Sequence, residues 1–287
     1  MIERIAILGT GLLGTSVGLA LRAAGYRGAI AGWNRSAEGA QTALKMGAIG
    51  EIVGDPIAAA RESDVTLLSV PIYASLDLME HLSGVLVCGQ LVTDVGSTKK
   101  QITEAAGRLF NTPERAAFLP GHPMAGKERG GAELGDASLF KGAVWLFTDD
   151  SSWVRSASGK RLAESWRSWV SAIGSRVIDI DATRHDEMVA WVSHLPQFTA
   201  TALSALLEDE VGDAPELRDV GGRALREMTR LGASPYSMWR DIAYTNTAAI
   251  ERALFALEQR LAHLRENLRT PGLREEFERA NEFRKDF

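Results

Sequence analysis

One histidine of this sequence lies between a glycine and a proline. His122 stands between Gly121 and Pro123, directly after the short apolar run Phe118-Leu119. Proline disfavours the helical conformation for the residue before it, so His122 is expected on an extended segment that follows a strand. An imidazole can take up and release a proton near neutral pH. His122 is therefore a candidate general base, although a lone loop histidine can also have no chemical role.

A serine follows a second apolar run. Residues 91–95 predict a buried strand, and Asp94-Val95-Gly96-Ser97-Thr98-Lys99 continues from its end. In open α/β sheets, ligands bind at the carboxyl edge of the strands. Ser97 is therefore a candidate donor to a substrate hydroxyl. It can also cap the helix that follows, and the two roles are compatible.

A glycine pattern near the N-terminus indicates a nucleotide site. Gly9-Thr10-Gly11-Leu12-Leu13-Gly14 matches G-x-G-x-x-G, follows the apolar run 5–8 and opens an apolar helical pattern. That context is the one a dinucleotide site requires. The glycines allow a tight turn and a close approach to a pyrophosphate, and the helix start offers free N–H groups. The predicted cofactor-binding residues of this loop, with a ligand-free turn as the alternative, are Gly9, Gly11, Leu12, Leu13 and Gly14.

The end of the second predicted strand selects between the nicotinamide cofactors. Sites for NAD usually place an Asp or Glu there to bind the ribose 2′-hydroxyl. This chain instead has Asn34, Arg35 and Ser36, which can together bind a 2′-phosphate. NADP is therefore predicted in preference to NAD, which stays possible. The alternative is that Arg35 is only solvated and that Asn34 caps a helix.

The elements that must position these residues divide the chain into two parts. Up to residue 181, apolar runs alternate with helical patterns, which indicates a parallel sheet covered on both faces. After residue 181 the strand signals stop. We therefore predict an α/β fold, with an N-terminal Rossmann-type parallel-sheet domain, residues 1–181, and an all-helical dimerisation domain, residues 182–287. The predicted strands are residues 5–8, 29–33, 65–70, 91–95, 118–119, 144–147 and 176–179, and the predicted helices are 13–24, 185–210, 216–231, 235–245 and 247–269.

Three smaller features complete this assignment. Val70-Pro71 ends a predicted strand, where it is expected either beside the nicotinamide ribose or as a simple strand stop. Residues 151–159 are polar and predict a surface loop before a helix that contains Trp166 and Trp169. His185-Asp186 is interpreted as the start of the helical part and not as chemistry.

A leucine repeat indicates how the helical part could associate. Apolar residues recur at alternating steps of four and three at Ile250, Leu254, Leu257, Leu261, Leu264 and Leu268. This heptad seam suits a partner helix, and a core stripe within one chain is the alternative. The helical part is also small for a self-sufficient core, which favours a homodimer.

Composition excludes several classes of protein. The net charge of −5 favours neither nucleic acid nor an anionic membrane surface. Cys88 is the single cysteine, so a disulfide framework and a cysteine-based zinc site are excluded within one chain, and no metal is predicted. The N-terminus has no signal-peptide pattern, and no apolar run is long enough to cross a bilayer. A cytoplasmic location is expected.

Five segments in one order resemble the prephenate/arogenate dehydrogenase family. They are Gly-x-Gly-Leu-Leu-Gly-x-Ser at 9–16, Val-Gly-Ser-x-Lys at 95–99, Gly-His-Pro-Met-Ala-Gly at 121–126, Ser-His-Leu-Pro at 193–196 and Arg-Leu-Gly-Ala-Ser-Pro-x-x-x-Trp-Arg-Asp-Ile at 230–242. The resemblance spans nearly the whole chain. It implies oxidative decarboxylation of a cyclohexadienol, in which hydride passes to the nicotinamide, carbon dioxide leaves and the ring becomes aromatic.

The resemblance also implies roles for particular residues. His122 hydrogen-bonds the ring hydroxyl of the substrate, and Ser97 assists at the same hydroxyl. Arg230 binds a substrate carboxylate, with an ordinary surface ion pair as the alternative. Trp239 and Glu128 lie near the substrate, with a place in the core as the alternative for Trp239. His194 is either a substrate contact or a helix residue satisfied by the backbone. The family often carries a second histidine after Ser-His-Leu-Pro, where this chain has Gln197; strict prephenate preference is therefore in doubt, unless Gln197 only caps or packs within its helix.

The predicted function is that of a prephenate dehydrogenase of tyrosine biosynthesis, with an arogenate dehydrogenase as the alternative. A 3-hydroxyacid dehydrogenase would use a lysine of the helical part, and no lysine occurs between residues 182 and 284. A redox sensor that binds NADP without catalysis is a further alternative. The presence of His122, Ser97 and Arg230 together argues against such a sensor, because a sensor would not need these three residues. Tight NADP binding without turnover would support it.

Overall fold

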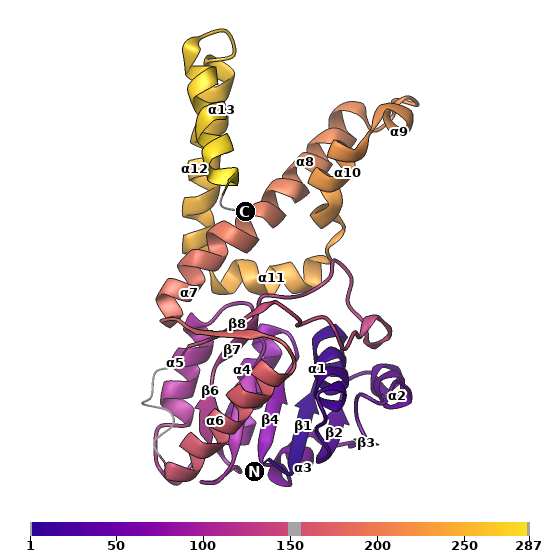
Figure 1. Ribbon diagram of the computed structural model, residues 1–287, viewed down its shortest axis with the longest axis vertical. Coiled ribbons are helices and arrows are strands. Elements are labelled where there is room, and N and C mark those ends of the chain that lie inside the picture. The colour runs from indigo at the N-terminus through magenta and orange to yellow at the C-terminus, as the bar shows by residue number, and fades with distance from the viewer. Residues whose placement is uncertain (1, 149–155, 286–287) are drawn as a thin grey trace.

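The computed structural model describes residues 2–148 and 156–285, and its N-terminal half is an α/β domain. A six-stranded parallel sheet has the strand order β3-β2-β1-β4-β5-β6, with helices on both faces (Figure 1). The Rossmann-type prediction is confirmed. In chain order the elements are β1 (Arg4–Leu8), α1 (Leu12–Ala23), β2 (Ala29–Trp33), α2 (Ala37–Lys45), β3 (Glu51–Ile52), α3 (Pro56–Arg61), β4 (Val65–Leu68), α4 (Ile72–Ser83), β5 (Leu91–Asp94), α5 (Lys100–Leu109) and β6 (Ala117–Leu119).

The sheet is buried on both sides because successive side chains of a strand point to opposite faces. In β1, Ile5 and Ile7 belong to one apolar cluster, whereas Ala6 and Leu8 belong to the other. The four residues of this run are fully buried. A continuous apolar run is therefore the expected sequence of such a strand.

A second, smaller sheet departs from the sequence prediction. The strands β7 (Gly121–Pro123), β8 (Val144–Phe147) and β9 (Arg176–Asp179) form a separate three-stranded sheet, in which β7 and β8 are antiparallel. The predicted strands 144–147 and 176–179 exist, but they do not extend the parallel sheet. The segment with His122 is itself a strand of this second sheet. Helix α6 (Ala157–Ala172) joins β8 to β9, and residues 151–155 of the predicted loop lie outside the described residues.

The helical half begins at α7 (Ala182–Val189), where the side chain of Asp181 accepts a hydrogen bond from the amide of Arg184 at 2.9 Å. Residues 190–194 form a π-helical turn, and Gly221-Gly222 splits the predicted helix 216–231. The last helix, which Thr270 caps and which begins at Pro271, was not predicted from the sequence. The elements are π-turn η3 (Ala190–His194), α8 (Leu195–Val211), α9 (Leu217–Val220), α10 (Arg223–Thr229), η4 (Arg230–Ala233), α11 (Tyr236–Thr245), α12 (Thr247–Glu266) and α13 (Pro271–Arg284).

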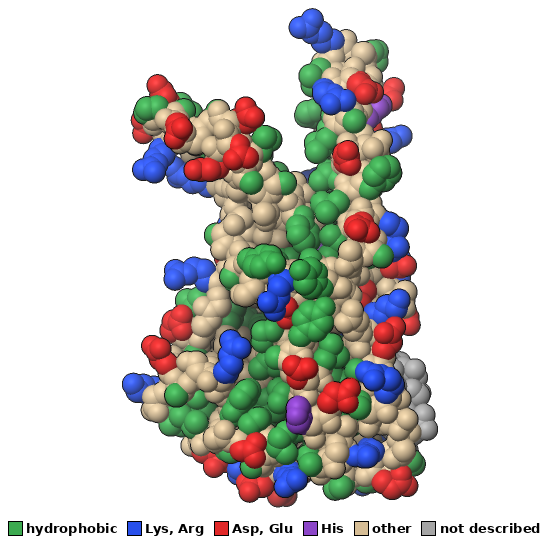
Figure 2. Space-filling model, turned by 180° about the vertical axis from the view of Figure 1, so that it is seen from behind, with side chains coloured by type: hydrophobic (Ala, Val, Ile, Leu, Met, Phe, Trp, Pro, Cys, Tyr) green, Lys and Arg blue, Asp and Glu red, His purple; other side chains and the backbone are tan. Residues whose placement is uncertain are grey.

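Two helical arms diverge from the α/β half (Figure 1): α8 with α10, and α12 with α13. The predicted heptad seam runs along α12 as far as Leu264, whereas Leu268 lies in the turn after the helix, and the exposure of the seam changes along its length. Ile250 is buried against the core, whereas Leu261 and Leu268 are 56% and 63% exposed. Figure 2 shows hydrophobic side chains on both arms and below the point where they diverge. The first turns of α12 therefore pack within the chain, and its outer turns present apolar surface.

No helix among the described residues is both long enough and apolar enough to cross a membrane.

Candidate active site

The glycine loop after β1 has the geometry that a pyrophosphate requires. Gly9 has a φ of 108°, and a Cβ built on it would lie 2.2 Å from the carbonyl oxygen of Ser69. Gly14 is as confined, because its Cβ would meet the carbonyl oxygen of Gly9 at 2.0 Å. A Cβ on Gly11 would meet nothing within 4 Å, and Gly11 starts α1 without a side-chain cap. The loop thus combines an uncapped helix start with open space above it, which fits a bound phosphate group.

The residues after β2 lie at the position that contacts the adenosine ribose in such folds. Asn34 donates from Nδ2 to the carbonyl oxygen of Ser36 at 3.1 Å, and Ser36 caps α2. Ser36, not Asn34, is therefore the helix cap. Arg35 is exposed, and the nearest acidic residue along α2 is Glu38 in its first turn. A guanidinium without an adjacent carboxylate at the strand end suits a 2′-phosphate.

Val70 and Pro71 connect the end of β4 to the start of α4. Pro71 is the N-cap residue of α4 and so ends the β4 segment. Val70 lies against the glycine loop, because its Cγ1 is 2.7 Å from the position of a Cβ on Gly9. The strand stop therefore adjoins the nucleotide loop.

His122 is buried in β7 and contacts a second histidine. Its Nδ1 lies 2.8 Å from Nε2 of His185, and His185 Nδ1 lies 2.8 Å from Oδ1 of Asp186. Burial lowers the pKa of His122 well below its ordinary value, and the positive charge of Lys99 lowers it further, as a proton on His185 or His194 would. His122 is therefore neutral at pH 7, which is the form that can accept a proton.

A buried ion pair holds the segment that carries Ser97. Asp94 and Lys99 are both fully buried and form an ion pair. The Oδ1 atom of Asp94 accepts a hydrogen bond from the amide of Gly121 at 3.0 Å. Its Oδ2 atom, which contacts Lys99, also accepts from the amide of Gly96 at 2.8 Å. One carboxylate thus ties the loop after β5 to the start of β7.

Ser97 itself is half-buried, and it does not cap the next helix. The N-cap residue of α5 is Lys99, and the amides of Lys99 and Lys100 donate to the carboxylate of Asp186 at 2.7 and 2.9 Å. Helix α7 therefore supplies the cap of α5. The capping alternative for Ser97 is wrong, and its hydroxyl is available for another partner.

His194 lies at the end of the π-turn and is 1% exposed. Its Nδ1 is 3.4 Å from Nδ2 of Asn246, and its ring packs edge-on against Trp239 with 5.8 Å between centroids. Burial lowers the pKa of His194 to about 4. The indole nitrogen of Trp239 is buried and has no hydrogen-bond partner within the described part of the chain. A single-turn π-helix is frequently found at functional sites.

Arg230 and Glu128 form an ion pair that joins the helical half to the loop after His122. Arg230 is the first residue of η4, and its side chain is 61% exposed. Gln197 braces the same turn: its Nε2 donates to the carbonyl oxygen of Leu231 at 2.7 Å, and its Oε1 accepts from Ser234 at 3.0 Å. These contacts support the alternative in which Gln197 packs and positions the turn after Arg230.

His185 and Asp186 were predicted only as a helix start, and their place beside His122 was not predicted. Helix α7 begins three residues earlier, at Ala182, and both side chains face the α/β half. An adjacent His-Asp pair at the junction of the two parts was the available signal. The predicted site residues therefore lie in two groups. One is a buried cluster around His122, and the other is the ion pair of Arg230 with Glu128, which is more exposed than that cluster.

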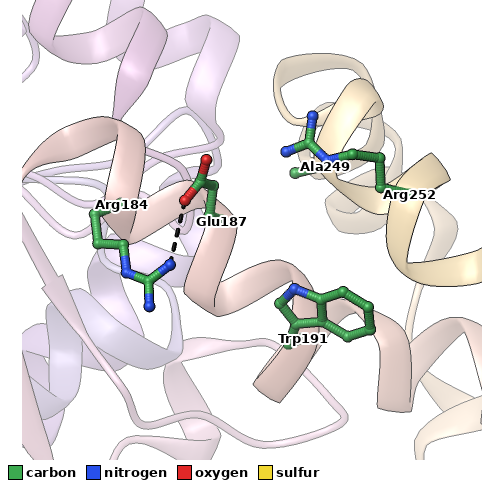
Figure 3. A pocket seen from close by; sticks show the side chains of 5 residues that line it. All are labelled: Arg184, Glu187, Trp191, Ala249 and Arg252. Carbon is green, nitrogen blue, oxygen red and sulfur yellow. Dashed lines mark hydrogen bonds and ion pairs between the residues drawn. The ribbon is translucent and has the colours of Figure 1, made fainter. Parts of the chain in front are cut away.

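A surface pocket of about 240 Å³ lies on the opposite, exposed side of α7 (Figure 3). Arg184 and Glu187 of α7 form an ion pair at 3.3 Å, and Trp191 and Arg252 complete the lining with Ala249. The cluster around His122 contributes no residue to this pocket.

Comparisons with known proteins assign both parts of the chain to one family. Residues 17–178 match the family model described as prephenate dehydrogenase, nucleotide-binding domain, and residues 181–283 match prephenate dehydrogenase, dimerization domain. The chain is 31% identical over 245 residues to a prephenate dehydrogenase of Lactococcus lactis subsp. cremoris, which covers 85% of this chain and 65% of that protein. The chain thus spans less than two thirds of the length of that relative.

Two solved structures are similar over almost the whole chain. The prephenate dehydrogenase of Aquifex aeolicus in complex with hydroxyphenyl propionate and NAD+ has a TM-score of 0.83 and 28% identity, covering 100% of this chain and 96% of its own. Synechocystis arogenate dehydrogenase has a TM-score of 0.77 and 26% identity, covering 99% of both chains. With two family models that together match most of its residues, the chain belongs to the prephenate dehydrogenase family.

Proposed function

We propose that this chain is an NAD(P)-dependent dehydrogenase that oxidatively decarboxylates prephenate, arogenate or both. The observation that carries the proposal is a buried histidine, His122, at the same edge of the sheet as the nucleotide loop, where burial lowers its pKa. Residues 9–14 follow β1, Ser97 follows β5, and His122 follows β6. The carboxyl ends of these parallel strands form one edge, where open α/β sheets bind their ligands.

The residues divide the chemistry between them. A nicotinamide cofactor held at the glycine loop, residues 9–14, would supply the acceptor for the hydride of the ring carbon that carries the hydroxyl. The neutral imidazole of His122 accepts the hydroxyl proton as carbonyl character grows, and Ser97 hydrogen-bonds the same oxygen. The ring carboxylate leaves as carbon dioxide, and its bonding electrons complete the aromatic ring. Arg230 holds a carboxylate of the substrate, while Trp239, His194 and Glu128 line the site beside it.

The cofactor and the assembly are part of the same proposal. NADP is preferred because Arg35, beside Asn34 and Ser36, follows β2 where NAD sites usually carry an acid. Residues 1–181 bind the nucleotide, and residues 182–287 mediate a homodimer. The exposed apolar side chains of the arms, including Phe255, Leu261 and Leu268, support such an interface.

A steady-state assay of prephenate and arogenate, each with NADP and NAD, tests the proposal directly. In that assay His122→Asn should lower kcat by on the order of 10²–10⁴-fold, the scale for loss of a general base. The matched control is His81→Asn on the exposed surface of α4, which should leave kcat unchanged.

A kcat of His122→Asn within a few-fold of the wild type would assign the base to another residue. Tight NADP binding without turnover of either substrate would instead support a non-catalytic sensor.

A further inference from the structure

Three buried side chains form an unbroken hydrogen-bonded line behind His122. Asp186 is 4% exposed, His185 is 0% exposed and His122 is 7% exposed. The two contacts, from Asp186 Oδ1 to His185 Nδ1 and from His185 Nε2 to His122 Nδ1, are both 2.8 Å long. The line results from the packing of α7 against β7.

The hydrogen-bond donors of the line follow from its acidic end. The carboxylate of Asp186 already accepts the amides of Lys99 and Lys100, so it faces His185 as an acceptor. His185 must therefore donate from Nδ1. A neutral imidazole has only one N–H group, which leaves Nε2 of His185 as an acceptor. His122 must in turn donate from Nδ1, and its own Nε2 keeps a free lone pair.

The opposite arrangement is unfavourable at a buried site. If His122 carried its proton on Nε2, its Nδ1 lone pair would face His185. If His185 kept its proton on Nδ1, two lone pairs would then face each other. If His185 instead carried its proton on its own Nε2, its unprotonated Nδ1 would face the carboxylate of Asp186. Both leave a buried polar group without a partner, which is costly. Burial lowers the pKa of both histidines, so relief through a second proton is also disfavoured.

We propose that His185 and Asp186 are positioning residues, which fix His122 in the tautomer whose Nε2 can accept the substrate hydroxyl proton. This inference rests on the proposed function, in which His122 is the base. Neither positioning residue has to touch the substrate. Because α7 belongs to the helical half and β7 to the α/β half, docking of the two halves completes the base.

Three substitutions of His185 separate this role from simple packing. In His185→Gln the amide oxygen can replace Nε2 as the acceptor toward His122. In His185→Asn the shorter amide can still donate to Asp186 but does not reach His122. In His185→Phe the ring volume remains and both nitrogens are lost. We expect kcat to stay within about 10-fold of wild type for Gln and to fall by about 10²-fold or more for Asn and Phe, with KM little changed.

The tautomer itself can be measured without substrate. The chain has five histidines, so the ring ¹⁵N signals of a histidine-labelled protein can be assigned by single substitutions. Long-range ¹H–¹⁵N correlation spectra of the full chain distinguish protonated from unprotonated ring nitrogens. We expect wild type and His185→Gln to show His122 protonated at Nδ1 alone, and His185→Phe and His185→Asn to show both tautomers.

The outcomes distinguish the inference from the function beneath it. A wild-type His122 protonated at Nε2, or a His185→Phe variant with unchanged tautomer and kcat, overturns the positioning role. Full activity of His122→Asn overturns the base assignment instead, while the tautomer spectra still report on the hydrogen-bonded line.

Discussion

Lys99→Met should destabilise the protein strongly, because it leaves a buried carboxylate without its counter-ion. Both Lys99 and Asp94 are 0% exposed. Removing one member of a buried pair typically costs about 3–5 kcal/mol. Asp94 keeps two backbone donors, the amides of Gly96 and Gly121, which offset part of the loss. We therefore expect a loss near the lower end of that range, about 3 kcal/mol, in the free energy of unfolding.

Urea unfolding at pH 7 and a single protein concentration measures this loss. The matched control is Lys100→Met, since Lys100 is the exposed neighbour on α5 and should change the free energy by less than about 0.5 kcal/mol. In the cycle with Asp94→Asn, the double variant should be more stable than the summed single losses predict. A loss below about 1 kcal/mol for Lys99→Met would refute the reasoning, because it would mean that the pair is not desolvated.

Four further predictions concern the cofactor, the substrate and pH. Arg35→Ala should lower kcat/KM with NADP while sparing NAD, and equal losses with both cofactors would remove Arg35 from the phosphate site. Arg230→Ala should chiefly raise the substrate KM, and Arg230→Lys should recover only part of the affinity because the planar fork is lost; an unchanged KM would make the arginine structural. Gln197→His should move the ratio of kcat/KM toward prephenate by a factor equivalent to about 1–2 kcal/mol, whereas a constant ratio with higher KM for both substrates would mean that residue 197 only braces its turn. Burial lowers the pKa of His194 in the folded protein from 6.5 to about 4, so the unfolded chain binds the proton first as the pH falls. The contribution of the neutral His194 to the free energy of unfolding should therefore be fully present above pH 6.5 and be lost below it, by up to about 1.4 kcal/mol per pH unit. An equal slope in His194→Asn would contradict this.

Much of the nucleotide half could be predicted from the sequence, because its signals are local. A buried parallel strand is a continuous apolar run, and residues 5–8, 29–33 and 65–68 of the predicted runs all lie in the sheet. The glycine loop is also a local signal, since Gly9 and Gly14 answer steric demands of one turn. Family membership followed from short motifs such as residues 121–126, because such motifs can be recognised in the sequence without knowledge of the fold.

The pairing of strands was beyond the sequence, because it depends on partners far apart along the chain. Residues 144–147 read as another strand of the main sheet, and only tertiary structure assigns them to a sheet with β7 and β9. The break at Gly221-Gly222 and the helix α13 were local signals that the hydrophobic pattern obscured.

The sequence by itself determined which residues are able to do chemistry here: His122 with its flanking glycine and proline, Ser97, Arg230 and the glycine loop. Only the tertiary structure decided which of them act together. His185 and Asp186 are 63 and 64 positions beyond His122 in the numbering, and they reach it because α7 docks against β7 and caps α5. Protonation states at such a site depend on burial and on hydrogen bonds between distant segments, so they arise when the two halves of the chain pack and not from any one segment.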